Sequence, residues 1–202
     1  MSYSGKGMKL GITGGIGSGK TSVCKVFTVL GIPVFSADPE ARRIMNNHPE
    51  IIMGINKIAG KDLYSDGNLN SGELASLIFN NEAKLKEVNS LVHPVVFNYF
   101  LEWAETQVAP YVIMEAAILF ESGASELVDR VATVVAPVEQ RIARVTLRNK
   151  LSKEQITERM KNQMDDDFRI RRSDYVIYNS ETDMIIPAIL NIHEDILTHL
   201  NS

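Results

Sequence analysis

The chain has 202 residues, 45% of them hydrophobic and 23% charged, with a formal net charge of −4. This balance indicates a globular chain and excludes a disordered one. A net acidic composition disfavours nucleic acid as a partner, and no apolar run approaches the ~20 residues of a membrane span. We therefore expect a cytoplasmic protein without nucleic-acid or membrane partners. Met1 to Gly7, small and polar, are expected to be a tag or a flexible extension.

The first predicted strand covers Met8 to Thr13, a short apolar run that ends in glycines. Apolar residues then recur at helical spacing from Lys20 to Leu30, and Gly31 stands where a helix commonly ends. The single cysteine, Cys24, lies in this helix, so we expect a packed thiol rather than a reactive thiol or a metal ligand. A second short strand is predicted for Ile32 to Phe35.

The middle of the chain, 39–110, has a mostly helical pattern without strands. Its first helix is expected to begin at Asp38-Pro39-Glu40, with Asp38 at the N-cap position. Turn-forming residues at 65–68 and the pair His93-Pro94 are expected to interrupt the helices. This segment is predicted to be a helical insertion on the sheet.

Further strands are predicted at Tyr111 to Glu115, Arg130 to Ala136 and Tyr175 to Tyr178. Between the last two, Arg141 to Lys161 has the pattern of two helices, and Ser152 with Gln155 can form a capping box for the second. A last amphipathic helix is predicted from Thr182 to Leu200.

Strands that alternate with helices predict an α/β fold with a doubly wound parallel sheet of five strands. We expect one domain over 1–202, with its core at 8–38 and 111–202. The helical insertion is expected at 39–110 and a helical lid at about 141–165.

The segment Gly14-Gly-Ile-Gly-Ser-Gly-Lys-Thr21 matches the phosphate-loop pattern G-x-x-x-x-G-K-[ST] in full. Glycines let the backbone turn its N–H groups toward a phosphate, and the helix that follows adds the positive end of its dipole. The residues expected to hold the phosphates of ATP are Gly15, Ile16, Gly17, Ser18, Gly19, Lys20 and Thr21. Lys20 is expected to reach the β- and γ-phosphates as a catalytic residue, and the Thr21 hydroxyl to bind the cofactor Mg²⁺.

Together with the doubly wound sheet, this loop predicts a fold of the phosphate-loop nucleoside triphosphate hydrolase type. Two classes of protein with this fold do not match the sequence. A guanine-nucleotide switch would need an N-K-x-D motif, and the Asn-Lys pairs at Asn56 and Asn149 lack the aspartate. A large ATPase motor would need a longer chain. Small size, a helical insertion and a late group of arginines therefore indicate a kinase of a small metabolite.

Several further segments carry a family resemblance over Met8 to Asn191. They are Leu30 to Asp38 with Ala41 and Arg42, Asp66 to Leu69, Leu74 to Phe79, Leu91 to Pro94, Ile118 to Glu121, Arg144 with Arg148, Gln163, and Ser173 to Asn179. Together with the phosphate loop, they resemble the dephospho-coenzyme A kinase family. The resemblance implies ATP-dependent phosphorylation of the ribose 3′-hydroxyl of dephospho-coenzyme A, the last step of coenzyme A synthesis. Its partners would be ATP and dephospho-coenzyme A.

Three residues depart from the family pattern. Ser36 stands where the family usually has Asp, Ala117 where it usually has Pro, and Ser71 where a basic residue is common. The first two are expected to be tolerated local changes. The third bears on contacts with the acceptor rather than on the phosphoryl donor.

Asp38 follows the second predicted strand, at the carboxyl edge of the sheet where ligands bind in open α/β folds. Transfer to an alcohol needs a carboxylate that orients the hydroxyl and takes its proton. The resemblance assigns this catalytic role, with contact to the acceptor, to Asp38. The alternative is that Asp38 only caps the helix that follows it.

Arg144 and Arg148 lie one helical turn apart in the predicted lid. An arginine that closes over the γ-phosphate stabilises the charge of the transition state, so both are predicted to be catalytic. The alternative is a solvated helix face. Arg141, nearer the sheet, is expected to be structural.

Following the resemblance, we expect the helical insertion to bind the acceptor, which would contact Arg42, His93 and Glu121 in addition to Asp38. We expect the adenine of ATP to contact Asn179. Each position has a simpler alternative: His93 as a buried or capping histidine, Glu121 as a surface glutamate and Asn179 as a turn residue. Glu115, at the end of a strand, could hold Mg²⁺ through water.

The carboxylates Asp165 to Asp167 are interpreted as a solvated loop or helix end rather than a metal cluster, because successive residues do not face one way on a helix. Two other functions stay open at this point. One is a phosphate-loop kinase for a nucleoside, nucleotide or sugar-acid acceptor, and the other is a nucleotide-binding regulator with little catalysis. A monomer or a small homo-oligomer is expected.

Overall fold

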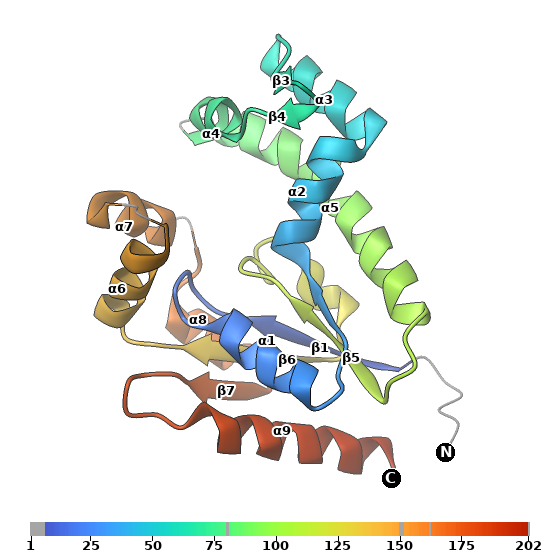
Figure 1. Cartoon of the computed structure of the whole chain (residues 1–202), viewed down its shortest axis with the longest axis vertical. Helices are drawn as coiled ribbons and strands as arrows, with labels where there is room; N and C mark the ends of the chain where they lie inside the picture. The colour runs from blue at the N-terminus through green and yellow to red at the C-terminus, as the bar shows by residue number, and fades with distance from the viewer. Residues whose placement is uncertain (1–6, 80, 150–151, 162, 202) are drawn as a thin grey trace. The chain divides into compact units, whose positions relative to one another are not determined.

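The computed structural model describes residues 7–79, 81–149, 152–161 and 163–201. The expected tag or extension, Met1 to Gly7, lies outside these ranges apart from Gly7. The chain divides into two compact units, Met1–Ser36 with Trp103–Ser202 and, separately, Ala37–Glu102. Figure 1 shows the helices and strands of both units. In the described ranges, no helix combines the length and the apolar character needed to cross a lipid bilayer.

The first unit is built on a five-stranded sheet in the order β2-β5-β1-β6-β7. The strands are β1 (Met8–Thr13), β2 (Val34–Ser36), β5 (Tyr111–Glu115), β6 (Arg130–Val135) and β7 (Tyr175–Tyr178). Every neighbouring pair runs parallel, so the predicted doubly wound sheet is confirmed. β2 begins later than predicted because the Ile32 N–H donates back to the Phe27 carbonyl at the end of the preceding helix.

Helices α1 (Lys20–Val29) and α9 (Ile185–Leu200) pack on one face of this sheet (Figure 1). The side chains buried between them and the strands are Leu10, Ile12, Val23, Cys24, Phe27, Ile32, Tyr111, Ile113, Ala132, Val134, Ile177, Ile189, Ile192 and Ile196. Their alternation along the strands and their helical spacing are the patterns from which these elements are predicted. Burial of this apolar surface is the main stabilising contribution to the unit.

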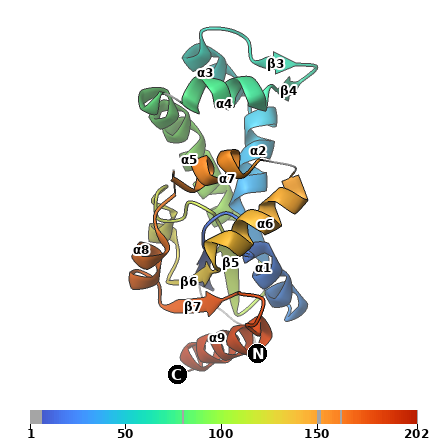
Figure 2. The ribbon, with the colours of Figure 1, turned by 90° about the vertical axis from the view of Figure 1, so that its left-hand side faces the viewer.

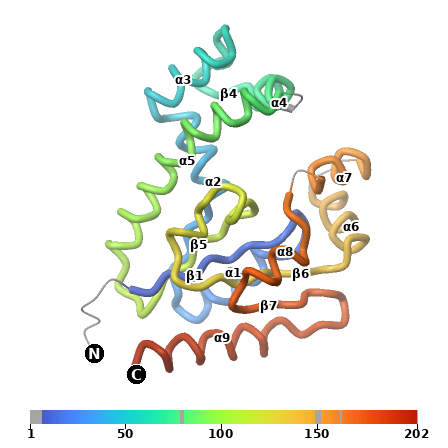
Figure 3. The backbone as a smooth tube through the Cα atoms, turned by 180° about the vertical axis from the view of Figure 1, so that it is seen from behind, coloured from blue at the N-terminus to red at the C-terminus, as the bar shows by residue number. Residues whose placement is uncertain are grey.

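The opposite face of the sheet is covered by segments that the sequence pattern does not reveal. Leu119 and Val128, from the connection after β5, lie next to Gly11 on the face away from α1. This connection contains the short 3₁₀ helix η1 (Ala124–Leu127), and the short helix α8 (Asp166–Arg171) lies on the same face, as Figure 3 shows from behind. One or two turns of helix carry too few residues for a periodic pattern to be recognised.

The segment expected to be the lid forms α6 (Val138–Asn149) and α7 (Lys153–Lys161), which lie side by side in Figure 2. The predicted capping box at the start of α7 is confirmed. The Ser152 N–H donates to Gln155 Oε1 at 3.0 Å, and the Gln155 N–H donates to Ser152 Oγ at 3.3 Å. Val145 of α6 and Ile156 of α7 are fully buried, which explains how two helices with few apolar residues hold together.

The second unit contains α2 (Ala37–Asn47), α3 (Pro49–Ala59), β3 (Tyr64–Ser65), β4 (Asn68–Leu69), α4 (Ser71–Phe79) and most of α5 (Glu82–Glu105). The mostly helical pattern is confirmed, but the absence of strands is not, because β3 and β4 form an antiparallel pair. Asp66 and Gly67 join them with positive φ angles of 50° and 75°, the backbone of a tight two-residue hairpin turn. The turn was predicted at this place and its two short strands were not.

Two expected helix boundaries in the second unit are wrong. α2 begins at Ala37, so Asp38 lies inside the first turn instead of at the N-cap. α5 continues through His93-Pro94, although Pro94 removes one backbone donor. Buried side chains every four residues on both sides of this pair stabilise a single continuous helix; they are Val88, Val92, Val96 and Phe100.

Candidate active site

The phosphate loop, Gly14 to Gly19, connects β1 to α1 at the carboxyl edge of the sheet. Gly19 has a φ of 99°, and a Cβ atom there would collide with Nδ2 of Asn179, so only glycine fits. The N–H groups of Ser22 and Val23 donate to the Gly19 carbonyl at 2.9 and 3.1 Å and start α1 directly after the loop. The helix N-terminus therefore opens onto the loop, an arrangement that binds anions.

The ammonium group of Lys20 lies on the loop itself. Its Nζ donates to the Gly14 carbonyl at 2.8 Å and lies 3.5 Å from the Gly15 carbonyl. The side chain is buried, although it carries a charge. A cation held at this point is placed to pair with phosphate oxygens bound by the loop.

Three side chains from three elements meet where β2 and β5 end. Thr21 Oγ1 donates to Glu115 Oε1 at 2.9 Å, and Ser36 Oγ donates to Glu115 Oε2 at 3.0 Å. Strand pairing places Ser36 directly opposite Glu115, so this contact follows from the register. Ser36, one of the departures from the family pattern, thus has a defined partner.

This group of three, Thr21, Ser36 and Glu115, supplies only oxygen ligands, one carboxylate and two hydroxyls. Over the described part of the chain, no group of three or more His, Cys, Asp and Glu side chains could hold a metal. Mg²⁺ prefers oxygen ligands, keeps several waters and usually binds through one or two carboxylates together with phosphates. The sparse oxygen set beside the phosphate loop fits that ion.

Arg144 and Asn179 are brought together next to the phosphate loop. Asn179 Nδ2 donates to the Ser18 carbonyl at 2.7 Å, and Arg144 Nη2 donates to the Asn179 carbonyl at 2.9 Å. Asn179, predicted to contact ATP, therefore touches the loop, and Arg144, predicted to be catalytic, contacts Asn179. Arg148 lies in the last turn of α6, one turn beyond Arg144, with an exposed side chain.

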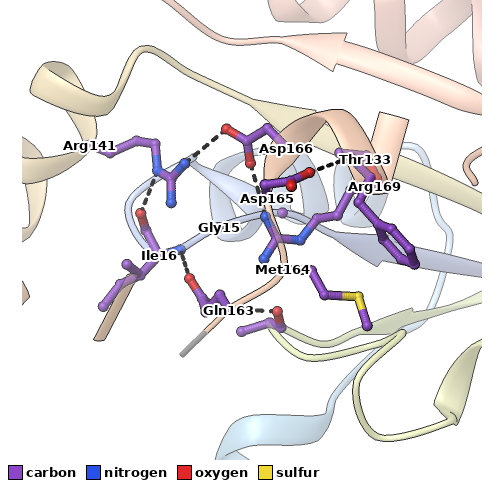
Figure 4. A network of polar contacts seen from close by, with 12 residues as sticks. Gly15, Ile16, Thr133, Arg141, Gln163, Met164, Asp165, Asp166 and Arg169 are labelled. Atoms are coloured by element: carbon purple, nitrogen blue, oxygen red, sulfur yellow. Dashed lines mark hydrogen bonds and ion pairs between the residues drawn. The ribbon is translucent and has the colours of Figure 1, made fainter. Parts of the chain in front are cut away.

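Arg141 supports the loop from the other side, in the network that Figure 4 shows. Only 5% of this residue is exposed; its Nε donates to the Ile16 carbonyl and its Nη1 to Asp166 Oδ2, both at 2.9 Å. Burial lowers the pKa of Arg141, an effect that the Asp166 carboxylate opposes. A side chain that is buried and paired in this way is structural, as expected from its place near the sheet.

The carboxylates at 165–167 are only partly as expected. Asp165 caps α8 by accepting from the Phe168 N–H at 2.6 Å, which confirms a helix end. Asp166 is not a solvated residue, because its two oxygens pair with Arg141 and Arg169, each at 2.9 Å. The two arginines are almost fully buried and need this charge close by.

Glu121, predicted to contact the acceptor, belongs to the same network. Its Oε1 accepts from the Met164 N–H at 2.9 Å and lies 3.5 Å from Nη2 of Arg169. Its side chain is only 18% exposed, so an ordinary surface glutamate is not what the structure contains. Gln163 and Arg169 also support this region. Gln163 belongs to the family resemblance without an assigned role, and Arg169 has no periodic or motif signal.

The prediction of a packed thiol at Cys24 is confirmed. The side chain is 4% exposed on the inner face of α1. Burial raises the pKa of the Cys24 thiol well above its ordinary range, and the Glu115 carboxylate adds to the effect. The thiol therefore stays protonated and unreactive.

The remaining predicted residues belong to the second unit. Asp38 and Arg42 lie four residues apart on α2, and both side chains are exposed on that helix. On α5, the ring of His93 stacks on Phe97 with centroids 5.9 Å apart, and burial lowers the pKa of His93. Ser71 begins α4, with its Oγ 3.5 Å from the Leu69 carbonyl.

Comparison with known proteins identifies a family. The family model described as dephospho-CoA kinase matches residues 8–184. A dephospho-CoA kinase from Bacteroides fragilis is 37% identical over 186 residues, which cover 92% of this chain and 91% of the relative. A dephospho-CoA kinase from Salinibacter ruber is 40% identical over 177 residues, which cover 86% of this chain and 89% of the relative.

Solved structures agree on the fold. A Thermus thermophilus protein superimposes with a TM-score of 0.82 at 29% identity, covering 96% of this chain and 98% of that one. A dephospho-CoA kinase from Campylobacter jejuni gives a TM-score of 0.67 at 24% identity, covering 95% and 98%. A shikimate kinase from Acinetobacter baumannii gives 0.53 at 18% identity, covering 96% and 94%. The last two similarities concern the fold alone.

Proposed function

The chain belongs to the dephospho-CoA kinase family, and we propose the residues with which it carries out the ATP-dependent last step of coenzyme A synthesis. In this reaction the γ-phosphoryl group of ATP passes to the ribose 3′-hydroxyl of dephospho-CoA, and ADP is released. The observation that carries the proposal is the grouping of the phosphate loop, Lys20 and the Thr21–Glu115 pair at one edge of the sheet.

The phosphate loop is the proposed donor site. Backbone N–H groups of the segment from Gly15 to Thr21 would surround the phosphates, apart from that of Ile16, which donates to Gln163. Lys20 would move from the loop carbonyls to the β- and γ-oxygens. Asn179 is proposed to hold the loop on the side where the nucleoside is bound, since its amide already contacts the Ser18 carbonyl. No covalent enzyme intermediate is needed, because positioning and charge stabilisation suffice for phosphoryl transfer.

Mg²⁺ is the proposed cofactor. Thr21 would bind it through the hydroxyl, and Glu115 would hold one of its waters, since the two side chains already share a hydrogen bond. The ion supplies neutralisation of the phosphate charge that develops during transfer. Ser36 would orient the Glu115 carboxylate from its other oxygen.

The lid arginines are the proposed stabilisers of the transferring group. Arg144 and Arg148 project from the same side of α6, one turn apart. A guanidinium group close to the γ-phosphate offsets the charge spread over its oxygens in the transition state. Arg144 is tied to Asn179 and would act nearer the nucleotide, whereas Arg148, further along the helix, would act on the transferring group.

Asp38 is the proposed base. Its carboxylate would orient the acceptor hydroxyl and take its proton as the bond to phosphorus forms. Support comes from chain connectivity: β2 ends at Ser36, whose side chain contacts Glu115, and Asp38 follows two residues later. Arg42, His93 and Glu121 are proposed to contact the acceptor, with Arg42 four residues from Asp38 on α2.

The test is an acceptor screen with the purified chain, MgATP and detection of ADP. Dephospho-CoA is expected to give a product heavier by one phosphate, and removal of that phosphate by a 3′-nucleotidase identifies the hydroxyl. Turnover of a nucleoside or sugar acid without any turnover of dephospho-CoA would contradict the proposal. ATP binding without turnover of any acceptor would instead indicate a regulator.

The oligomeric state and the cellular location of the enzyme are also part of the proposal. We propose a cytoplasmic monomer or small homo-oligomer, in keeping with the free, protonated thiol of Cys24. Light scattering of the purified chain at several concentrations gives the oligomeric state.

A further inference from the structure

The backbone of Ile16, in the middle of the phosphate loop, is held on both sides by side chains from a distant part of the chain. The Ile16 N–H donates to Gln163 Oε1 at 2.8 Å, and the Ile16 carbonyl accepts from Arg141 Nε at 2.9 Å. Figure 4 shows the two side chains reaching Ile16 from different directions. The two residues flank the lid helices, since Arg141 lies near the start of α6 and Gln163 follows α7.

Both supports are themselves fixed. Arg141 is buried and paired with Asp166. The amide nitrogen of Gln163 donates to the Ala117 carbonyl, at 3.4 Å, in the connection after β5. One partner of the Gln163 amide is a donor and the other an acceptor, so only one orientation of the amide satisfies both.

The contact with Gln163 determines where the carbonyl of Gly15 points. In a trans peptide the N–H of Ile16 and the C=O of Gly15 lie in one plane and point in opposite directions. Because the N–H is directed at Gln163, the Gly15 carbonyl faces the loop interior. There it accepts from the Ser18 N–H at 3.1 Å and lies 3.5 Å from Nζ of Lys20.

We propose that Gln163 is a positioning residue that sets the peptide between Gly15 and Ile16 and, through it, the ammonium group of Lys20. The side chain couples the end of the lid to the donor site without touching the nucleotide. This inference rests on the proposed function of the loop as the ATP site. Without Gln163, the peptide is free to rotate, and the Gly15 carbonyl then no longer holds the Ser18 N–H and the Lys20 ammonium group in place, which weakens nucleotide binding.

The experiment replaces Gln163 with Met, which has a similar length but no amide. Q163M is expected to bind ATP about tenfold more weakly in calorimetry and to have a lower kcat, with KM for the acceptor within about twofold. Gln155 provides the matched control, since it lies on α7 and, among the residues that the structure describes, its side chain bonds within its own helix cap. Q155M is expected to leave nucleotide affinity unchanged.

A direct measurement follows the Ile16 amide in the nucleotide-free chain. Its hydrogen exchange, observed by NMR, is expected to be slow in the wild type and in Q163E, which keeps an acceptor oxygen, and fast in Q163M. If Q163M does not fold, Q163N replaces it, because its amide is one methylene too short to reach Ile16, and the same tenfold loss is expected.

An unchanged affinity for ATP in the folded Gln163 variant, or an equal loss in Q155M, overturns the inference. So does an Ile16 amide that exchanges equally in the wild type and Q163M. Affinity and amide exchange are measured without an acceptor. A chain that bound ATP but failed to phosphorylate dephospho-CoA would therefore overturn the proposed function while this test remained decisive.

Discussion

The Thr21 hydroxyl and the Glu115 carboxylate are joined by a hydrogen bond of 2.9 Å, from the first turn of α1 to the last residue of β5. The other carboxylate oxygen of Glu115 is held by Ser36 at the end of β2. One side chain therefore fixes the relative positions of three elements at the edge of the sheet, directly beside the phosphate loop.

Glu115→Gln is expected to preserve the contacts with Thr21 and Ser36 but to remove the charge that would hold a magnesium-bound water. Activity should fall by about 10- to 100-fold, and more Mg²⁺ should be needed for half-maximal rate. Titration of Mg²⁺ at saturating ATP measures both effects. Glu126→Gln, an exposed carboxylate of η1, is the control and should behave like the wild type. A magnesium dependence that E115Q leaves unaltered would contradict the proposed role.

Asp38→Asn is expected to lower kcat by about 10²-fold or more, because the amide cannot take the proton of the acceptor hydroxyl. ATP affinity and thermal stability should change little. Glu40→Gln removes the other acid in the first turn of α2 and serves as the control. If Asp38 only favours the start of this helix, the two variants will lose similar, small amounts of stability and both will keep full activity.

Arg148→Ala is expected to lower kcat by about 10³-fold with little change in ATP affinity, since its charge is needed mainly in the transition state. Arg148→Lys keeps the charge without the planar fork and should recover part of the rate. Arg159→Ala, on the exposed surface of α7, tests whether any lid arginine has this effect. Pre-steady-state measurement of ADP formation separates the chemical step from product release. If R148A formed ADP in the pre-steady state as fast as the wild type, the proposed role of Arg148 in the transition state would be wrong.

Asp166→Asn is expected to lower the free energy of unfolding by about 3 kcal/mol, because Arg141 and Arg169 remain buried after their shared carboxylate is lost. Its neighbour Asp167 is exposed in the same helix turn, so Asp167→Asn should change stability by no more than about 0.5 kcal/mol. Urea unfolding of both variants measures the difference. Equal stabilities would mean that the network contributes nothing beyond local helix capping.

The folded chain is expected to lose stability in mild acid through His93. Burial lowers the pKa of its imidazole, so the unfolded chain binds the proton first as the pH falls below about 6.5. The free energy of unfolding therefore decreases with falling pH until the folded pKa is passed, and then levels off. His93→Gln should show a smaller loss between pH 7.5 and pH 5 than the wild type. His199→Gln, at an exposed site on α9, should lose as much stability over this pH range as the wild type.

The parts of the site that are continuous in sequence could be predicted from it. The loop from Gly14 to Thr21 is recognisable because its glycines, lysine and threonine are all needed within eight residues. The five strands and the capping box of α7 are likewise local patterns. The contact between Glu115 and Ser36 could not be predicted in this way. It depends on β5 lying beside β2, and the sequence pattern alone does not give the order of the strands.

Arg141 was expected to be structural and Gln163 belongs to the family resemblance. Their contacts with the loop could not be predicted, since they join residues far apart in the chain. The contact from Ile16 to Gln163 spans 147 positions, and that from Ile16 to Arg141 spans 125. Nor does a motif distinguish Asp166, which pairs with two arginines, from Asp167, which is exposed. At Pro94 the local rule for breaking a helix was wrong because tertiary burial of α5 outweighed it.

The single carboxylate of Glu115 has a kinetic consequence for the proposed cofactor. With serine at position 36, the group beside the loop carries one negative charge rather than two, too little to retain a hydrated divalent ion by itself. In the proposed mechanism the triphosphate would complete the coordination, so the ion would arrive as a complex with ATP and depart with ADP. Each catalytic cycle would then begin with an exchange of metal as well as nucleotide, and the rate of product release would become sensitive to the free magnesium in the surrounding solution.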